Sequence, residues 1–237
     1  MSRPAPLPEP DAFAAFIAAG IEPALAERLA VYVALVLDAN RRLNLTGAKD
    51  GTAFGAHVLD ALTLREDVAS PLIDVGSGNG VPGIPLALAT GARVVLLEPI
   101  KKRATFLAAA LGALGIDGEA VAMRAEDAAR DPAFRGAFAT ATARAVASGP
   151  TVAELTVPFL AVGGRALLQR GSLDPLERNA VADSALVLGA ELTAERPLDG
   201  ERRVLVLEKR VLTGPRFPRK NGIPAKRPLC MPRPSSS

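Results

Sequence analysis

The stretch PLIDVGSGNGVPGIPLALA, residues 71–89, decides the fold. An apolar run ends on Asp74, three glycines alternate over residues 76–80, and an apolar helical segment begins near Pro82. Glycine adopts positive φ and leaves no side chain over the backbone, so such a loop permits a sharp turn and a close approach to a ligand. A tight connection from a strand to a helix that binds no ligand needs fewer glycines. The stretch therefore predicts a strand, a ligand-binding loop and a helix.

Residues beyond this stretch alternate between strand-like and helical patterns. Short runs rich in β-branched and apolar residues predict strands near residues 72–75, 93–98, 119–123, 137–142 and 164–169. Apolar residues spaced three and four apart predict helices near residues 82–90, 101–114, 149–160 and 174–188. Strands and helices in alternation are typical of the α/β class, so we predict a Rossmann-like, mostly parallel, doubly wound sheet.

The segments on either side depart from this alternation. Residues 190–196 and 202–210 are strand-like runs joined through Asp199-Gly200 with no helix between them, which predicts an antiparallel hairpin at one edge of the sheet. Residues 11–66 instead show helical spacing, including an amphipathic helix that begins at Glu22-Pro23 and reaches Asn40.

Length and composition limit the class of protein. The 237 residues are 49% hydrophobic, which suffices for one main domain with an appendage. The longest unbroken apolar run, Leu29–Leu37, has nine residues, about half of the roughly 20 that cross a bilayer. The first residues lack the basic end and apolar stretch of a secretory signal, and Cys230 has no second cysteine to pair with. We expect a cytoplasmic monomer that does not bind membranes.

Positive charge is concentrated near residue 237. The segment 215–237 has no acidic residue, and its six basic residues are Arg216, Arg219, Lys220, Lys226, Arg227 and Arg233. They exceed the formal net charge of +3 for the whole chain. Such a segment is either a solvated, flexible tail or an arm that neutralises phosphates on a nucleic acid, and charge alone does not decide between the two. The expected organisation is a helical region at 1–66, the α/β domain at 67–213 and a basic, flexible tail at 214–237.

The glycine-rich loop lies where α/β sheets bind ligands, beyond the carboxyl end of a central strand. Glu98 closes the second strand 24 residues after Asp74, about where a nucleotide fold places its ribose-binding carboxylate. Gly78-Asn-Gly80-Val-Pro-Gly83 also matches the dinucleotide fingerprint. A dinucleotide site, however, has its first glycine directly after the strand, and an acid at the strand's end repels phosphate. The acid suits a ligand with an ammonium and a sulfonium, so we predict S-adenosylmethionine as the cofactor.

Several motifs resemble those of a known enzyme family. The stretches DVGSGNGVPGIPLA and LLEPIKKRATFL and the pair Glu126-Asp127 are similar to motifs of the class I methyltransferases. The bacterial small-subunit rRNA guanine-N7 methyltransferases, also called glucose-inhibited division protein B, share Asn44-Leu45-Thr46, His57-Val-Leu-Asp60, Ala143-Arg144-Ala145 and the tail Phe217–Leu229. This similarity runs from about residue 40 to 229. It implies methylation of N7 of one guanosine in the decoding-region loop of 16S rRNA, free or in the small ribosomal subunit.

The reaction that the resemblance implies needs little acid or base chemistry. N7 of guanine carries a lone pair and no proton at neutral pH, so no general base has to remove one. The site instead has to align N7, the methyl carbon and the leaving sulfur. The sequence has a single histidine, no Cys-His pairing and no metal-ligand cluster, so we expect no metal. Many proteins that are not enzymes share these features.

The cofactor-binding residues expected from the loop and the resemblance are Asp74, Gly76, Ser77, Gly78, Gly80, Glu98, Ala125, Glu126 and Arg144. Asp74 and the glycine loop are expected to hold the methionine end, Glu98 the ribose, and the chain at Ala125-Glu126 the adenine. Arg144 is the expected catalytic residue between cofactor and target base, where a guanidinium can hydrogen-bond either one. An ion pair with a surface carboxylate is its alternative role. His57 and Asp60 share a helix face, and we expect them to give structural support.

The expected RNA-binding residues are the cations Lys101, Lys102, Arg103, Arg170, Arg219, Lys220, Lys226 and Arg227. No tryptophan and only one tyrosine are present to stack on bases, so recognition would depend on these charges and on the shape of the RNA. Where the family commonly has Leu-Lys-Gly at the end of the fifth strand, this chain reads Leu168-Gln169-Arg170-Gly171, with a planar fork in place of a compact ammonium. Asn79 replaces a small residue or proline, and its amide either reaches the cofactor or caps the next helix.

Other functions stay open on the sequence alone. A methyltransferase of a protein or a small molecule would have no use for the basic tail. An RNA-binding ribosome-assembly factor would have an unused cofactor pocket, against which the intact Asp74, glycine loop and Glu98 count. A dehydrogenase is the weakest alternative, because the dinucleotide fingerprint lies too far from the strand.

Overall fold

The computed structural model describes residues 7–230 apart from 145–146, 173, 199 and 201. The strands are β1 (Leu72–Val75), β2 (Val94–Leu97), β3 (Gly118–Val121), β4 (Phe138–Arg144), β5 (Leu160–Arg170), β6 (Ala190–Pro197) and β7 (Arg203–Lys209). The α-helices are α1 (Pro10–Ala18), α2 (Pro23–Leu43), α3 (Gly51–Leu62), α4 (Gly83–Thr90), α5 (Lys101–Ala113), α6 (Ala125–Ala128), α7 (Gly149–Thr156), α8 (Pro175–Val187) and α9 (Ile223–Lys226). Two 3-10 turns are η1 (Arg65–Asp67) and η2 (Val157–Phe159).

The strands form one sheet in the order β3-β2-β1-β4-β5-β7-β6. β1 is the third strand of the seven and pairs in parallel with β2 and β4, and β5 continues the parallel part. β7 runs antiparallel to both β5 and β6. The predicted doubly wound sheet and its edge hairpin are both confirmed; Asp199, in the predicted turn, lies outside the described residues. The strand order reverses between β1 and β4, so the carboxyl end of β1 is the switch point at which such folds bind ligands.

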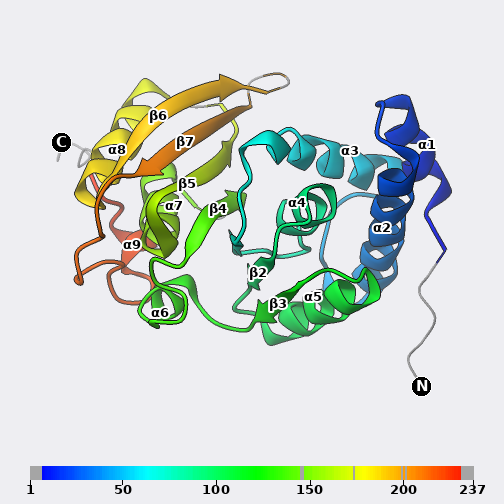
Figure 1. The fold of residues 1–237 in the computed structure, drawn as a ribbon, viewed down its shortest axis with the longest axis horizontal. Coiled ribbons are helices and arrows are strands. Elements are labelled where there is room, and N and C mark those ends of the chain that lie inside the picture. The colour runs from blue at the N-terminus through cyan, green and yellow to red at the C-terminus, as the bar shows by residue number, and fades with distance from the viewer. Residues whose placement is uncertain (1–6, 145–146, 173, 199, 201, 231–237) are drawn as a thin grey trace, which may run out of the picture.

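Helices cover both faces of this sheet (Figure 1). Consecutive strand residues face opposite sides, so Leu72 packs with the core formed by α1 to α5, whereas Ile73 packs with the core of α7 and α8. Strands buried on both faces carry continuous apolar runs, which is why β1 and β2 could be recognised in the sequence. The three helices before β1 share their core with α4 and α5.

Some element boundaries differ from the prediction. The helix predicted at 149–160 ends at Thr156 and continues as η2, because Pro158 has no N–H to donate to a preceding carbonyl. β5 begins at Leu160 and is longer than the predicted 164–169. α2 continues past Asn40 to Leu43 and stops where Asn44 adopts a left-handed conformation. The short helices α6 and α9 were not predicted.

Residues 214–230 pack against the domain, so the prediction of a flexible tail is wrong for this segment. Glu154 on α7 is fully buried, and both of its carboxylate oxygens accept hydrogen bonds from Arg219, at 2.9 Å from Nε and 2.6 Å from Nη2. Arg135 donates to the carbonyl oxygens of Phe217 and Gly214. One basic residue of the segment, Arg219, is the partner of a buried carboxylate, and charge counting along the chain does not reveal this role. Arg233 lies outside the described residues.

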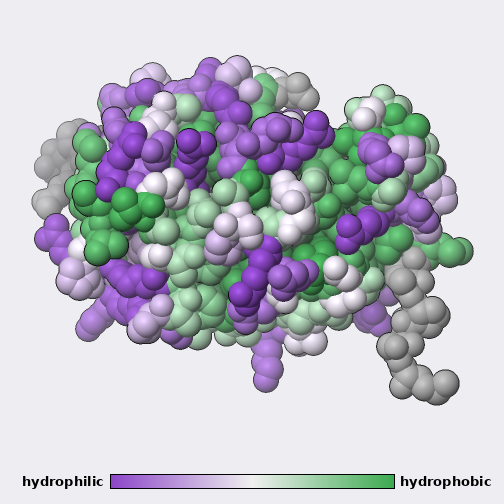
Figure 2. Space-filling view, viewed as in Figure 1, coloured by the Kyte–Doolittle hydropathy of each residue, from purple (hydrophilic) through white to green (hydrophobic). Residues whose placement is uncertain are grey.

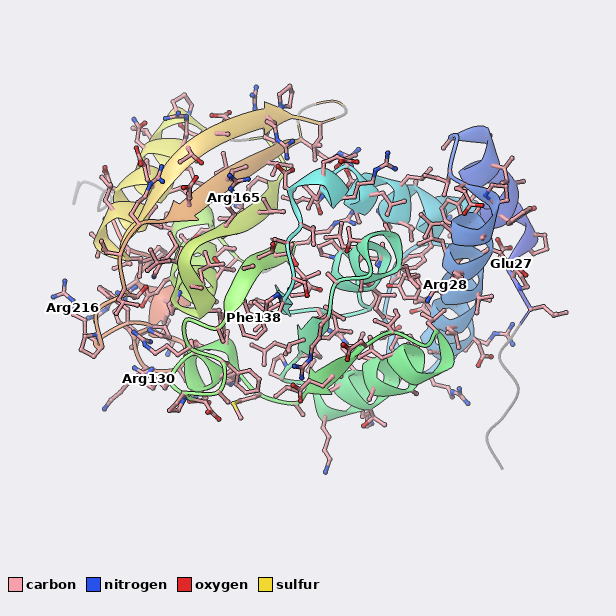
Figure 3. All side chains as sticks on the ribbon, viewed as in Figure 1. Glu27, Arg28, Arg130, Phe138, Arg165 and Arg216 are labelled. Carbon is pink, nitrogen blue, oxygen red and sulfur yellow. The ribbon has the colours of Figure 1, made fainter. Side chains whose placement is uncertain are left out.

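Arg219→Ala is expected to lower the free energy of unfolding by about 3–5 kcal/mol, because it leaves Glu154 buried without a charge partner. Arg216→Ala is the matched control. Arg216 lies three residues away, projects outward (Figure 3) and contacts the Phe217 ring at 4.9 Å, so its loss should cost at most about 1 kcal/mol. Urea unfolding of both variants measures the difference. Equal losses would show that the ion pair does not hold the segment in place.

The outer side of the β6 and β7 hairpin is hydrophilic (Figure 2). Glu195 on β6 pairs with Arg178 at 2.8 Å and with Arg203 at 3.1 Å. Charged side chains along an edge strand oppose pairing with another chain. Among the residues that the structure describes, no helix has the length and apolar character needed to cross a membrane.

Candidate functional site

The glycine-rich loop joins the carboxyl end of β1 to α4. Gly76, Gly78 and Gly80 have φ of 72°, 56° and 104°, which residues with a side chain rarely adopt. At Gly80 a β carbon would also lie 2.7 Å from Ile84 Cδ1 and 3.0 Å from Tyr32 Oη. Gly80 therefore has no room for a side chain, positive φ favours glycine at all three positions, and the prediction of a sharply turning, bare loop is confirmed.

Asp74 supports this loop from behind. Its side chain is 1% exposed; Oδ1 accepts from Thr142 Oγ1 at 2.9 Å, and Oδ2 accepts from the Gly83 N–H at 3.3 Å, at the start of α4. Burial raises the pKa of the Asp74 carboxyl to about 6, and these hydrogen bonds partly oppose the rise. The carboxylate therefore faces the sheet and α4. This placement differs from the direct contact with the cofactor that the sequence led us to expect.

Asp74→Asn is expected to stabilise the cofactor-free protein at neutral pH by up to roughly 3 kcal/mol. Between pH 3.8 and about 6 the folded protein binds more protons at Asp74 than the unfolded chain does, so wild-type stability falls as pH rises through that window. Asparagine carries no charge; its Oδ1 can accept from the Gly83 N–H while its Nδ2 donates to Thr142 Oγ1, whose hydroxyl then donates to the Ile73 carbonyl. Unfolding free energies measured from pH 4 to 8 are expected to diverge as pH rises. A difference that does not change with pH would contradict the assignment.

Glu98 joins the end of β2 to the glycine loop. Its side chain is 4% exposed; Oε2 accepts from the Gly78 N–H at 3.0 Å and Oε1 accepts from the Ile100 N–H at 2.8 Å. The acid and the loop are 20 residues apart in the chain and in contact in the structure. This hydrogen bond fixes the position of the Gly78 backbone and brings two of the predicted site residues together.

A cavity of about 230 Å³ lies over the loop. Its lining residues are Leu45, Thr46, His57, Gly76, Ser77, Gly78, Asn79, Val81 and Arg144. Four predicted site residues, the run 76–78 and Arg144, thus meet here. Leu45 and Thr46 were singled out only as part of a motif, and their place in this wall is a finding of the structure.

Asn79 fastens the loop to the segment after α2. Its Nδ2 donates to the Leu45 carbonyl at 3.2 Å and its Oδ1 accepts from the Val81 N–H at 3.1 Å. α4 has no side-chain cap, so the prediction that Asn79 caps it is not met. The buried hydroxyl of Tyr32 on α2 donates to the Asn79 carbonyl at 2.9 Å. The N-terminal helices therefore hold the loop as well as covering the sheet.

Arg144 is held by α3 at the rim of this cavity. Its guanidinium lies 3.0 Å from His57 Nδ1, 3.3 Å from the His57 carbonyl and 3.6 Å from Asp60 Oδ2. Burial, and then the neighbouring Arg144 charge, lower the pKa of His57, so the imidazole is neutral at pH 7 and Nδ1 can accept from the guanidinium. Asp60 is 8% exposed and also pairs with Arg202 at 2.8 Å. The structural support expected from His57 and Asp60 is therefore that they position Arg144. Ala145, the next residue of the motif, lies outside the described residues.

Ala125 and Glu126 begin α6 and do not line the cavity over the loop. Glu126 is 7% exposed, and its Oε1 accepts from the Gly222 N–H, 96 residues later in the chain, at 2.9 Å. Asp127 Oδ2 accepts from Asn221 Nδ2 at 2.8 Å. The segment after β7 therefore reaches the carboxyl end of β3, a contact for which the sequence carries no local signal.

The cations predicted to bind RNA divide into two groups. The exposed ones are Lys101, Lys102, Lys220, Lys226 and Arg227. They lie at the start of α5 and in the C-terminal segment. Both are on the side of the domain where the parallel strands have their carboxyl ends and where the glycine loop lies. Arg170 pairs with Glu177 at 2.8 Å, Arg219 with Glu154 at 2.6 Å, and Arg103 donates to the Asn44 carbonyl at 3.2 Å. Arg170 and Arg219 therefore form internal ion pairs, with Arg170 Nε lacking a hydrogen-bond partner among the described residues, and Arg103 makes one internal hydrogen bond. Within the described residues, no group of three or more His, Cys, Asp and Glu could hold a metal ion.

Two solved structures with a similar fold are methyltransferases. The mitomycin 7-O-methyltransferase MmcR superposes with a TM-score of 0.53 at 13% identity, covering 73% of this chain and 60% of that one. A ribosomal protein L11 methylase from Lactobacillus delbrueckii subsp. bulgaricus gives 0.52 at 15%, covering 66% and 80%. At these identities the likeness concerns the fold, and it confirms the predicted class I methyltransferase architecture.

Sequence relatives are closer. The Ribosomal RNA small subunit methyltransferase G of Rubrobacter xylanophilus is 44% identical over 211 residues, covering 83% of this chain and 81% of that protein. The protein of the same name from Pelotomaculum thermopropionicum is 37% identical, with coverage of 84% and 88%. The profile of the family described as rRNA small subunit methyltransferase G matches residues 25–206. The chain therefore belongs to the rRNA small subunit methyltransferase G family.

Proposed function

We propose that this chain transfers the methyl group of S-adenosylmethionine to N7 of one guanosine in the decoding-region loop of 16S rRNA. Its family is described as rRNA small subunit methyltransferase G. The observation that carries the proposal is that the bare backbone at 76–78 and the Arg144 guanidinium line one cavity at the switch point of the sheet.

The residues around the loop fit the cofactor. We assign its methionine end to the backbone of Gly76 and Gly78, its ribose hydroxyls to the Glu98 carboxylate, and its adenine to the chain at Ala125 and Glu126. A backbone without side chains admits close approach, and a carboxylate beside it can accept two hydroxyl hydrogen bonds. When bound, the cofactor supplies a sulfonium methyl carbon for attack by the N7 lone pair; the C–S bonding electrons leave with sulfur and the positive charge passes to the base.

The chain's own residues align the reactants and move no proton. N7 has none to lose, and His57 is neutral and engaged with Arg144, so it does not act as a base. We assign Arg144 a contact with the target base, because its guanidinium lines the cavity while α3 holds it from behind. Fixing a donor in place before the substrate arrives lowers the cost of reaching the aligned geometry.

We assign RNA binding to the exposed cations Lys101, Lys102, Lys220, Lys226 and Arg227. They flank the edge of the sheet at which the methyl group is transferred, so phosphates neighbouring the target nucleotide can reach them. Such contacts position an RNA without reading its sequence and weaken as salt rises. We also propose that the protein acts as a monomer in the cytoplasm. Its substrate is rRNA, either free or in the small ribosomal subunit.

Transfer of radiolabelled methyl from S-adenosylmethionine to small ribosomal subunits and to total RNA tests this function. Both substrates are taken from cells that lack this protein, and the labelled nucleoside is identified after digestion. Label in 7-methylguanosine supports S-adenosylmethionine as the cofactor, rRNA as the substrate and N7 of guanine as the methylated atom. Cofactor binding without label in either RNA would overturn the proposal and favour a protein or small-molecule methyltransferase.

A further inference from the structure

A second cavity of about 230 Å³ adjoins Arg144. Its lining residues are Asp60, Arg144, Gln169, Arg170, Gly171, Leu198 and Arg202. Since Arg144 also lines the cavity over the glycine loop, the two cavities are neighbours on either side of one guanidinium. The second cavity therefore lies one side chain away from the cavity proposed for the cofactor's methionine end, and the cofactor assignment leaves it unused.

Gln169, which lines this cavity, carries a buried acceptor without a partner. It lies beside Arg144 in the register of β4 and β5 and is 7% exposed. Its Nε2 donates to the Asp60 carbonyl at 3.1 Å, and its Oε1 has no hydrogen-bond partner among the described residues. A carbonyl can only accept, so this contact fixes which end of the amide is the nitrogen. A buried acceptor without a donor is unfavourable, and its place on a side chain that lines a cavity indicates a ligand with an N–H or O–H.

Guanine matches the order of groups along this wall. Its edge carries N7, O6, N1–H and the 2-amino group in sequence, two acceptors followed by two donors. Along the protein, the loop cavity comes first, then the Arg144 donors, then the Gln169 acceptor. With O6 accepting from Arg144 and with N1–H and the 2-amino group donating to Gln169 Oε1, N7 faces the loop cavity. Adenine would place its N1 acceptor against the Gln169 Oε1 acceptor and its 6-amino donor against the Arg144 donors. Neither pair of groups can form a hydrogen bond.

We propose that the second cavity receives the target guanine, unstacked from the RNA, and that Gln169 is a residue that determines specificity by accepting hydrogen bonds from its Watson–Crick edge. Enzymes that modify a base commonly take it out of the stack and read that edge in a pocket. Leu198 and Gly171 supply the wall that is not polar. This proposal rests on the function proposed above and adds the identity of the base-reading group.

The test compares guanosine with inosine at the target position of a small-subunit RNA substrate, reconstituted with ribosomal proteins. Inosine keeps N7, O6 and N1–H and lacks only the 2-amino group. Wild-type protein is expected to show about tenfold lower kcat/KM on inosine, the scale of one lost hydrogen bond to a buried acceptor. Gln169→Met keeps the shape and removes both polar ends, so its ratio of guanosine to inosine activity is expected to fall to about one.

Gln169→Glu is the matched control variant. It keeps an acceptor toward the base and loses the donor to Asp60, so it is expected to retain preference for guanosine. Cofactor affinity, measured by calorimetry, is expected to change less than about threefold in both variants, because Gln169 does not line the loop cavity. If Gln169→Met and Gln169→Glu show the same ratio of guanosine to inosine activity, the hydrogen bond to Asp60 determines the preference and the proposal is wrong. A wild-type protein that does not distinguish inosine also overturns it. No methylation of guanosine by wild type would instead reject the proposed function.

Discussion

Gly78→Asp is expected to weaken S-adenosylmethionine binding at least about 100-fold, or roughly 2.7 kcal/mol, while leaving the protein folded. Gly78 has φ of 56°, and a β carbon added there would come no closer than 3.8 Å to its nearest neighbour, the Gly76 carbonyl oxygen. Aspartate tolerates this conformation better than most residues. Its carboxylate would lie in the cavity beside Glu98, where the methionine end of the cofactor is proposed to bind.

Gly78→Asn is the matched control for this prediction, since it has the same shape without the charge. We expect a loss of about tenfold from the side chain's volume and a larger loss for aspartate from like-charge repulsion. Calorimetric titration of each variant with the cofactor gives the affinities, and thermal unfolding checks the fold. Wild-type affinity in the aspartate variant would show that the cofactor does not lie over this loop.

Arg144→Ala is expected to lower kcat for methyl transfer by about 100- to 1000-fold, the range seen when one preorganised donor is removed from an active site. The dissociation constant of the cofactor is expected to change less than about threefold, because the backbone at 76–78 and Glu98 do not depend on Arg144. The physical reason is position: the guanidinium is held against His57 and Asp60 at the boundary of two cavities. Single-turnover rates and calorimetry separate the two quantities.

Arg165→Ala is the control for loss of an arginine as such. Arg165 is on β5 (Figure 3), half exposed, and 3.9 Å from Glu208, so we expect no change in kcat. Arg144→Lys keeps the charge and loses the planar fork, and an intermediate rate is expected. If Arg144→Ala lowers cofactor affinity as much as it lowers kcat, its role is to hold the cofactor.

Features that depend on neighbours in the chain could be predicted from the sequence. Leu72 faces one side of the sheet and Ile73 and Val75 face the other, because β1 is buried between two helical layers, and this run was recognised as a strand. The glycines at 76–80 were recognised as a ligand loop because positive φ is a property of single residues. Element boundaries near Pro158 were less accurate, because the helix gives way to a 3-10 turn that the apolar spacing does not reveal.

Features that depend on contacts between distant residues could not be predicted. The direction of the Asp74 carboxylate is set by Thr142, which lies 68 residues later, and by the start of α4. Arg219 and Arg170 were counted as free surface cations because their partners, Glu154 and Glu177, carry no signal of proximity in the sequence. Residues 214–230 therefore turned out to be part of the folded domain.

The sequence by itself determined the class of fold, the position of the ligand loop and the family, since strand burial, glycine conformation and motif order are properties of local chain chemistry. The tertiary structure alone decided which charged side chains are available to bind a ligand or RNA. A buried carboxylate such as Glu154 selects one arginine from a basic segment, and α3 turns Arg144 toward the boundary of two cavities. Desolvation makes unpaired buried charge costly, so the fold assigns partners that no spacing along the chain can show.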